Sequence, residues 1–345
     1  MNPVLEINQI DQIGNNLIAG SRVSKRFVDA LYGYLLEAYG LDQCFADPDV
    51  ELFVNAQANT YQRELNNIYG SIQLSPVRTS SGDLKRTITR KPDCKGIDLT
   101  QVKLLYDSGA FTDVLTNDRQ TPEIALKRQM TTLRELPFVP LETYLVSYDR
   151  LIDEKWIDGR REKQRWSVEE GRQAVRDTVD AASYLDSQRG FLGRFTLVMS
   201  CQGVDARQYR QCVEQVLKYA QPEDCIGLGG WCILGKQRRW LPVFWETIKA
   251  VIPAIAEANI KHVHIFGCTW YKPVQNCPPP IPLLLWLCDR YGIKLSTDGR
   301  SPIGKALWKD WRKAGATFPY WRHNLAWVKA ELATLRESAY YYSPP

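Results

Sequence analysis

The sequence contains no long apolar run. No stretch approaches the roughly 18 consecutive uncharged apolar residues that a membrane-spanning helix requires. The N-terminus also lacks the basic-then-apolar pattern of a secretory signal peptide. With 44% hydrophobic and 24% charged residues, the composition is typical of a globular protein in water. We therefore expect a cytoplasmic protein with no membrane partner.

Paired cysteines and clustered metal ligands are also missing. The nine cysteines include no CxxC pair and no zinc-knuckle spacing. Their odd number in a cytoplasmic chain argues for reduced thiols rather than disulfide bonds. They are Cys44, Cys94, Cys201, Cys212, Cys225, Cys232, Cys268, Cys277 and Cys288. We expect no disulfide framework, no metal site and no cofactor.

Net charge is only +5, but it is concentrated at the C-terminus. From Arg300 onward, eight Lys and Arg residues face three acids, so this segment carries the whole excess. Its bases alternate with tryptophans, a mixture that suits a nucleic-acid backbone and its bases. The alternative is a pair of amphipathic helices with core tryptophans and solvated charges. If the segment binds a polymer, the expected phosphate contacts are Lys305, Lys309, Arg312 and Lys313.

What the chain does contain is a regular alternation of strands and helices. Helical apolar spacing between Val28 and Leu36 predicts a helix in an N-terminal segment, residues 1–50. A capping box at Ser167 and Glu170 and the Thr121-Pro122 pair mark two later helix starts. Apolar runs predict strands at 51–54, 70–75, 102–106, 143–147, 195–199, 225–228, 262–266 and 293–296.

These eight strand–helix units predict an α/β fold, a (β/α)8 TIM barrel over residues 51–305. A basic, tryptophan-rich helical tail, residues 306–345, would pack on it. The polar and basic residues 76–100 and the charged stretch at 160–165 are predicted to be loops.

Polar residues stand where the predicted strands end. They are Asp107, Asp149, Gln202, Gly229, Gly230 and Asp298. Because parallel strands of a barrel end at the same mouth, we expect these residues to gather there. Paired carboxylates can act as nucleophile and acid/base at an anomeric carbon, and an Asp beside a Gln can read a purine edge. A glycine pair lets backbone N–H groups approach a flat ligand.

At these positions the chain resembles the tRNA-guanine transglycosylase superfamily, and within it the DpdA-like enzymes of 7-deazaguanine DNA modification. The resemblance covers about residues 100–305. Tyr106-Asp-Ser-Gly-Ala-Phe-Thr112 is similar to the family's D-S-G-G/A-[FY] motif, whose Asp acts in proton transfer and holds the base. Gln202-Gly203 is similar to a strand-end Gln-Gly, and Gly227-Leu-Gly-Gly230 to a glycine-rich segment that meets the base carbonyl.

The resemblance implies a role for each position. Asp298 matches the covalent nucleophile and Asp107 the residue that handles the base proton. Ser108 and Asp149 join Gln202, Gly229 and Gly230 as base-binding residues, and Tyr106 or Phe111 would stack on the base.

Three features depart from the family pattern. The tRNA enzymes carry C-x-C-x-x-C and a distant histidine after the nucleophile, which bind structural zinc. This chain has no cysteine after Asp298 and only His323, so the zinc site is expected to be missing. The surroundings Thr297-Asp298-Gly299-Arg300 differ from the usual tRNA-enzyme motif, and Ala110 replaces a glycine. The missing zinc site favours DNA over tRNA as the polymer.

The resemblance therefore implies a transglycosylase that exchanges guanine in DNA for a 7-deazaguanine such as 7-cyano-7-deazaguanine, through a covalent sugar–Asp298 intermediate. A partner protein that opens the duplex is possible, since the base must leave its helix. Three alternatives stay open: the same chemistry on tRNA, a catalytically silent barrel that binds nucleic acid, and a metal-dependent barrel hydrolase using His262 and His264.

Overall fold

The computed structural model describes the chain from the first barrel strand to Asp298, with gaps. The described residues are 50–55, 71–74, 77–78, 84–85, 103–134, 139–152, 155–157, 160–162, 166–231, 241–268 and 280–298. The predicted N-terminal helix and the basic tail lie outside these residues. None of the described helices is both long and apolar enough to cross a lipid bilayer.

Eight parallel strands form the centre of the fold. They are β1 (Val50–Asn55), β2 (Ser71–Leu74), β5 (Lys103–Tyr106), β6 (Glu142–Val146), β9 (Thr196–Cys201), β10 (Cys225–Leu228), β11 (His262–Ile265) and β12 (Lys294–Asp298). Hydrogen-bonded neighbours follow the order β1-β12-β11-β10-β9-β6-β5-β2, and β1 also pairs with β2. The strands therefore close into a ring.

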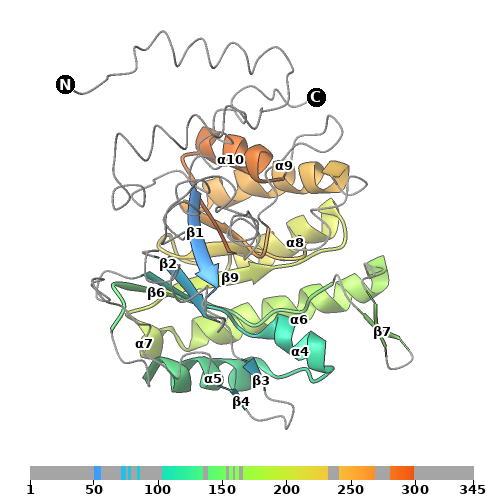
Figure 1. The fold of residues 1–345 in the computed structure, drawn as a ribbon. Coiled ribbons are helices and arrows are strands. Elements are labelled where there is room, and N and C mark those ends of the chain that lie inside the picture. The colour runs from blue at the N-terminus through green and yellow to red at the C-terminus, as the bar shows by residue number, and fades with distance from the viewer. Residues whose placement is uncertain are drawn as a thin grey trace, which may run out of the picture.

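Helices connect the successive barrel-forming strands from β5 to β12. They are α4 (Ala110–Thr116), α5 (Pro122–Arg134), α6 (Val168–Ser187), α7 (Arg189–Leu192), α8 (Ala206–Val216), α9 (Leu241–Glu257) and α10 (Pro280–Arg290). Figure 1 shows α5 and α6 on one side of the strands and α9 and α10 on the other. This arrangement confirms the predicted α/β class, with strand–helix–strand units from β5 to β12.

The helix starts follow from local side-chain chemistry. Ser167 and Glu170 form the predicted capping box at the start of α6. Thr121 Oγ1 accepts the N–H of Ile124 (3.4 Å) just before α5. At α8, Asp205 accepts the N–H of Gln208 at 2.8 Å. These caps satisfy N–H groups that have no partner within their helices.

Strand alternation divides the core into an outer and an inner layer. Leu104, Leu145 and Leu197 belong to a large cluster that includes residues of the surrounding helices. Their neighbours Leu105, Tyr144, Val146, Val198 and Cys225 form a separate cluster with Phe266. Because successive side chains of a strand point to opposite faces, the second cluster lies inside the ring. Residues at this inner parity that continue past the strand ends therefore face the mouth of the ring.

Several local features differ from the sequence prediction. Gly109 adopts a left-handed conformation (φ 85°), after which helix α4 begins where only a turn was predicted. The charged loop contains a short antiparallel pair, β7 (Lys155–Ile157) and β8 (Arg160–Glu162). A similar pair, β3 (Val77–Arg78) and β4 (Leu84–Lys85), lies within the predicted loop 76–100.

Candidate active site

The polar strand ends lie at one edge of the ring. Asp107 follows β5 directly, and Asp149 comes three residues after β6. Gln202 follows β9, Gly229 follows β10, and Asp298 is the last residue of β12. Because all these strands run parallel, their carboxyl ends share one mouth. The structure thus groups the five positions at the carboxyl edge of the parallel strands.

Asp149 and Gln202 are joined by a hydrogen bond. The Nε2 of Gln202 donates to Oδ2 of Asp149, and both side chains are buried. The backbone N–H of Gln202 points to Sγ of Cys212 (3.4 Å), which ties this strand end to α8. The buried Oε1 of Gln202 has no hydrogen-bond partner among the described residues. Leaving a buried acceptor unsatisfied costs about 1–3 kcal/mol, so a group that donates a hydrogen bond to this oxygen would be favoured.

The glycine pair lies directly against the Gln202 amide. A Cβ at Gly229 would collide with this amide, and one at Gly230 would lie 3.1 Å from its Oε1. Gly230 also has a φ of 80°, a conformation that favours glycine. The hydroxyl of Tyr209 lies 3.0 Å from the carbonyl oxygens of both Cys201 and Gly229, and it joins the two strand ends. Backbone rather than side chain therefore lines this side of the mouth.

The Asp149 carboxyl titrates near neutrality. Burial raises its pKa from the ordinary 3.8 to about 7. The hydrogen bond from Gln202 works in the opposite direction, and the negative charge of Asp107 raises the pKa further. A carboxyl of this pKa exists in both protonation states at pH 7, which suits it to take up and release a proton during catalysis.

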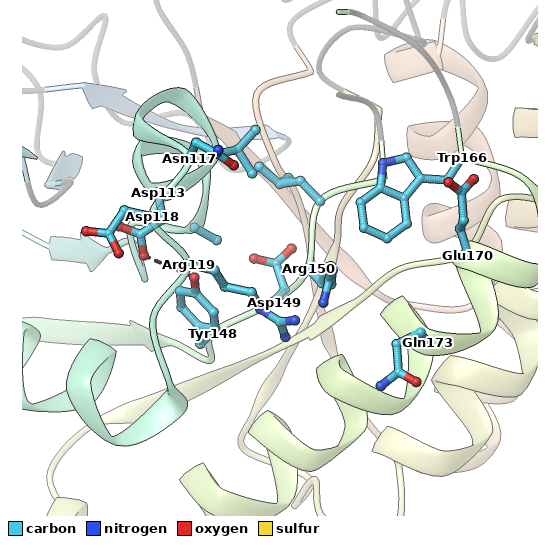
Figure 2. Close-up of a pocket in the computed structure, with 13 residues that line it drawn as sticks. Asp113, Asn117, Asp118, Arg119, Tyr148, Asp149, Arg150, Trp166, Glu170 and Gln173 are labelled. Carbon is cyan, nitrogen blue, oxygen red and sulfur yellow. Dashed lines mark hydrogen bonds between the residues drawn. The ribbon is translucent and has the colours of Figure 1, made fainter. Parts of the chain in front are cut away.

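A pocket of about 430 Å³ opens beside Asp149. Figure 2 shows the Asp149 side chain between those of Arg119, Tyr148 and Arg150, with Trp166 across the pocket. The Arg150 guanidinium lies 5.0 Å from the centre of the Trp166 ring. Arg119 and Arg150 each form an ion pair with Asp177 at 2.9 Å. The pocket therefore brings an aromatic face and two guanidinium groups next to the buried carboxyl.

The carboxylate of Asp298 is held through one oxygen. Its Oδ1 accepts the backbone N–H of Gly267 (2.8 Å) and lies 3.1 Å from Nε2 of His264. The Asp298 side chain is buried. Oδ2 of Asp298 accepts no hydrogen bond from the described residues. Oδ2 is therefore the oxygen available for bonding to a substrate.

The motif around Asp107 is only partly directed at the mouth. Ser108 is buried, and its Oγ accepts the N–H of Ala110 (3.4 Å), which closes the turn into α4. Tyr106 was predicted as one possible stacking residue, but that prediction is wrong, because its side chain is 1% exposed and packs in the outer core. Phe111 on α4 is 41% exposed and stays available for stacking.

The histidine pair considered for metal binding has other contacts. Nε2 of His262 and Nδ1 of His264 lie 2.7 and 2.9 Å from the same Oγ, that of Ser296. In the regions that the structure covers, no three His, Cys, Asp or Glu side chains are grouped as metal ligands. Cys268 and Cys288 are buried. Cys277, His323 and the four predicted phosphate-binding residues Lys305, Lys309, Arg312 and Lys313 lie outside the described residues.

Sequence reasoning missed two parts of this site. The sequence did not show that His264 lies against Asp298. The alternate spacing His262-x-His264 and Ser296-x-Asp298 does indicate that these residues occupy the inner face of two neighbouring strands. Sequence reasoning also missed the pocket formed with Arg119 and Trp166. These two residues lie in connections between the strands and carry no periodic pattern.

The comparisons with known proteins give no family. No family model matches the chain, and no curated protein matches it. Three solved structures are similar to it at low scores. A protein assigned as a fructose-1,6-biphosphate aldolase from Coccidioides immitis is 12% identical, with a TM-score of 0.35, covering 89% of this chain and 91% of that one.

The family 2 AP endonuclease from Brucella melitensis is 11% identical, with a TM-score of 0.37, covering 72% of this chain and 92% of that one. The YdjI aldolase from Escherichia coli K12 is also 11% identical, with a TM-score of 0.31 and coverages of 88% and 94%. At these scores the similarities assign neither a family nor a function.

Proposed function

We propose that the protein is a transglycosylase that exchanges guanine in a nucleic acid, DNA in the first instance, for a 7-deazaguanine such as 7-cyano-7-deazaguanine. The observation that supports this most is the separation of two kinds of group at one mouth. Asp149, Gln202 and the glycine pair form a buried polar cluster, and Asp298 presents a separate carboxylate. We place this activity in a complete (β/α)8 barrel, residues 51–305, flanked by helical segments at 1–50 and 306–345.

This polar cluster has the hydrogen-bonding groups that a guanine edge requires. Guanine carries N–H donors beside a carbonyl acceptor. The unpartnered Oε1 of Gln202 and the carboxyl of Asp149 accept from the donors, and the backbone N–H of Gly230 donates to the carbonyl, since that of Gly229 already donates to the carbonyl oxygen of Cys201. A ligand that satisfies the buried Oε1 removes the penalty of leaving this acceptor unpaired.

The chemical step is a displacement at C1′ of the sugar. Oδ2 of Asp298 forms a bond to C1′ as the bond from C1′ to N9 breaks, and the electron pair stays on the departing guanine. Asp107, protonated when this step begins, gives its proton to the departing base and is left as a carboxylate. The strand is then held as a sugar ester of Asp298.

The second displacement reverses these roles. The incoming 7-deazaguanine loses its N9 proton to Asp107, N9 attacks C1′, and the ester bond to Oδ2 breaks. Two displacements restore the original anomeric configuration, by the logic of a retaining glycosidase. The target nucleotide has to leave its helix to reach these residues, which costs a few kcal/mol in a duplex and less in a single strand.

Incubation of the purified protein with labelled 7-cyano-7-deazaguanine and single-stranded DNA, duplex DNA or tRNA tests the proposal. We expect label in DNA with the wild type and with Asp180→Ala, a control at an exposed carboxylate of α6, and none with Asp298→Ala. Label in tRNA alone would show that tRNA, and not DNA, is the polymer substrate. Binding of nucleic acid without any incorporation would contradict the proposal and support a silent barrel.

A further inference from the structure

A line of hydrogen-bonded side chains runs through the ring interior to Asp298. Nε2 of His262 lies 2.7 Å from Oγ of Ser296, and this Oγ lies 2.9 Å from Nδ1 of His264. Nε2 of His264 lies 3.1 Å from Oδ1 of Asp298. His264 and Ser296 are fully buried partners in the register of β11 and β12. The four side chains therefore form one continuous contact between the inner core and the mouth.

The Ser296 hydroxyl bonds to Nδ1 of His264 and thereby determines that Nε2, which faces Asp298, carries a proton. A hydroxyl both donates and accepts, so Ser296 serves Nδ1 of His264 as a donor when the imidazole is neutral and as an acceptor when it is charged. In both cases Nε2 carries a proton and donates to Oδ1 of Asp298. His262 completes the line. Its Nε2 donates to the Ser296 oxygen when the hydroxyl donates to His264, and it accepts from the hydroxyl when His264 is the donor.

Ring packing and backbone bonds fix this line in place. Tyr144 meets the His262 ring edge-on with centroids 5.5 Å apart, and Phe266 lies 4.7 Å from the His264 ring. Thr297 donates from its hydroxyl to the carbonyl oxygens of Ile265 (3.1 Å) or Cys268 (2.7 Å), beside the strand end. Neither imidazole can turn without disturbing the inner core.

From this geometry we propose that His264, oriented by Ser296 and His262, is a positioning residue for the Asp298 nucleophile. The inference rests on the proposed function of Asp298. The N–H groups of His264 and Gly267 both occupy Oδ1, which directs Oδ2 to C1′. When the ester forms, Oδ1 becomes its carbonyl oxygen, and both donors stay in place to stabilise the carboxylate that departs in the second displacement.

The tautomer can be measured without any activity, because the chain contains only three histidines. In protein labelled with 15N-histidine, we expect a protonated Nε2 at His264 in the wild type. Ser296→Ala should change the signals of His262 and His264 and leave those of His323 unchanged. An unprotonated Nε2 at His264, or insensitivity of both residues to Ser296→Ala, would overturn the inference whatever the enzyme's substrate.

Two amide variants of His264 separate positioning from a structural role. The amide nitrogen of a glutamine side chain reaches the place of Nε2, whereas that of the shorter asparagine does not. At saturating polymer, His264→Asn should slow formation of the covalent strand about 100-fold, with KM and free-base affinity nearly unchanged. His264→Gln should stay within about tenfold of the wild type, since it keeps a donor to Oδ1.

Equal rates for the two variants, or a loss confined to KM, would contradict positioning. Circular dichroism and thermal unfolding of both variants show whether a loss of rate reflects misfolding. If His264→Asn fails to fold, Ser296→Ala replaces it, with a smaller expected loss in the same rate and none in KM. A wild type that forms no covalent strand at all would instead refute the proposed function, and the tautomer measurement would still decide the arrangement around Asp298.

Discussion

The side-chain amide of Gln202 donates a hydrogen bond to the carboxyl of Asp149, 53 residues earlier in the chain. The contact joins the ends of two neighbouring strands, β6 and β9. It leaves the second Gln202 atom, Oε1, buried and without a hydrogen-bond partner among the described residues. A polar pair of this kind is costly for stability unless a ligand completes it, which is why we assign base recognition to it.

The first prediction concerns the proton on Asp149. Its pKa is raised by burial to about 7 in the folded protein and is near 3.8 when unfolded, so its protonated form favours folding. This contribution is fully present below about pH 4 and is lost as the pH rises to 7. Asp149→Asn stays neutral throughout, so its unfolding free energy relative to the wild type should rise by about 1.4 kcal/mol per pH unit across this window.

Urea unfolding at a series of pH values measures this difference. Asp180→Asn, at an exposed position of α6, is the matched control and should show no such slope. A pH-independent difference between Asp149→Asn and the wild type would mean that Asp149 is ionised in the folded protein, as an ordinary carboxyl is.

The second prediction concerns the glycine beside Gln202. A methyl group at Gly229 collides with the Gln202 amide, so Gly229→Ala should displace this side chain and weaken binding of the free base about tenfold or more. Gly190, in the short helix α7, has no atom within 4 Å of the corresponding methyl position. Gly190→Ala should leave base binding unchanged and should not lower stability. Calorimetric titration with 7-cyano-7-deazaguanine distinguishes the two, and equal affinities would remove Gly229 from the site.

The third prediction concerns the buried ion pair behind the pocket. One guanidinium nitrogen of Arg128 lies 3.2 and 3.4 Å from the two oxygens of Asp113, and the Tyr148 hydroxyl donates to the same carboxylate at 3.0 Å. Arg128→Met leaves this carboxylate buried without its cation, and the unfolding free energy should fall by about 3–5 kcal/mol.

The exposed pair of Arg172 and Glu169 provides the comparison. Arg172→Met should change the unfolding free energy by less than about 1 kcal/mol, because solvent screens the pair. Chemical denaturation of both variants gives the two values. A small loss for Arg128→Met would show that the Asp113 network does not support the pocket wall.

The fourth prediction concerns the basic tail, which lies outside the described residues. The tail carries the chain's whole charge excess and follows the proposed nucleophile. Neutralising Lys305, Lys309, Arg312 and Lys313 together should weaken polymer binding and reduce its salt dependence by roughly one slope unit per lost phosphate contact. Affinity for the free base should not change. An unaltered salt slope would show that these residues are solvated helix charges that do not contact the polymer.

The strand ends could be predicted because they depend on local pattern. Apolar runs that end in Asp107, Gln202 or Asp298 mark both the strand and the side chain at its carboxyl end, and parallel pairing then brings these ends to one edge. The α/β class and the capping of α6 by Ser167 were accessible for the same reason.

Contacts between strands could not be predicted in this way. Periodicity predicts which face of a strand a residue occupies. It does not predict that His264 and Ser296 are register partners or that Gln202 reaches Asp149. Tyr106 shows the same limit, since its position beside the Asp107 motif suggested stacking although strand parity turns its ring into the outer core.

The most direct test of the account is the identity of the residue that becomes bonded to the strand. Wild-type protein is incubated with an oligonucleotide that contains the target guanine, quenched with denaturant and examined by mass spectrometry after proteolysis. The account predicts a peptide that carries the sugar-linked strand on Asp298, and none in Asp298→Asn, which keeps the side-chain shape but not the nucleophile. A strand bonded to another residue such as Asp107, or base exchange without any bonded strand, would contradict it.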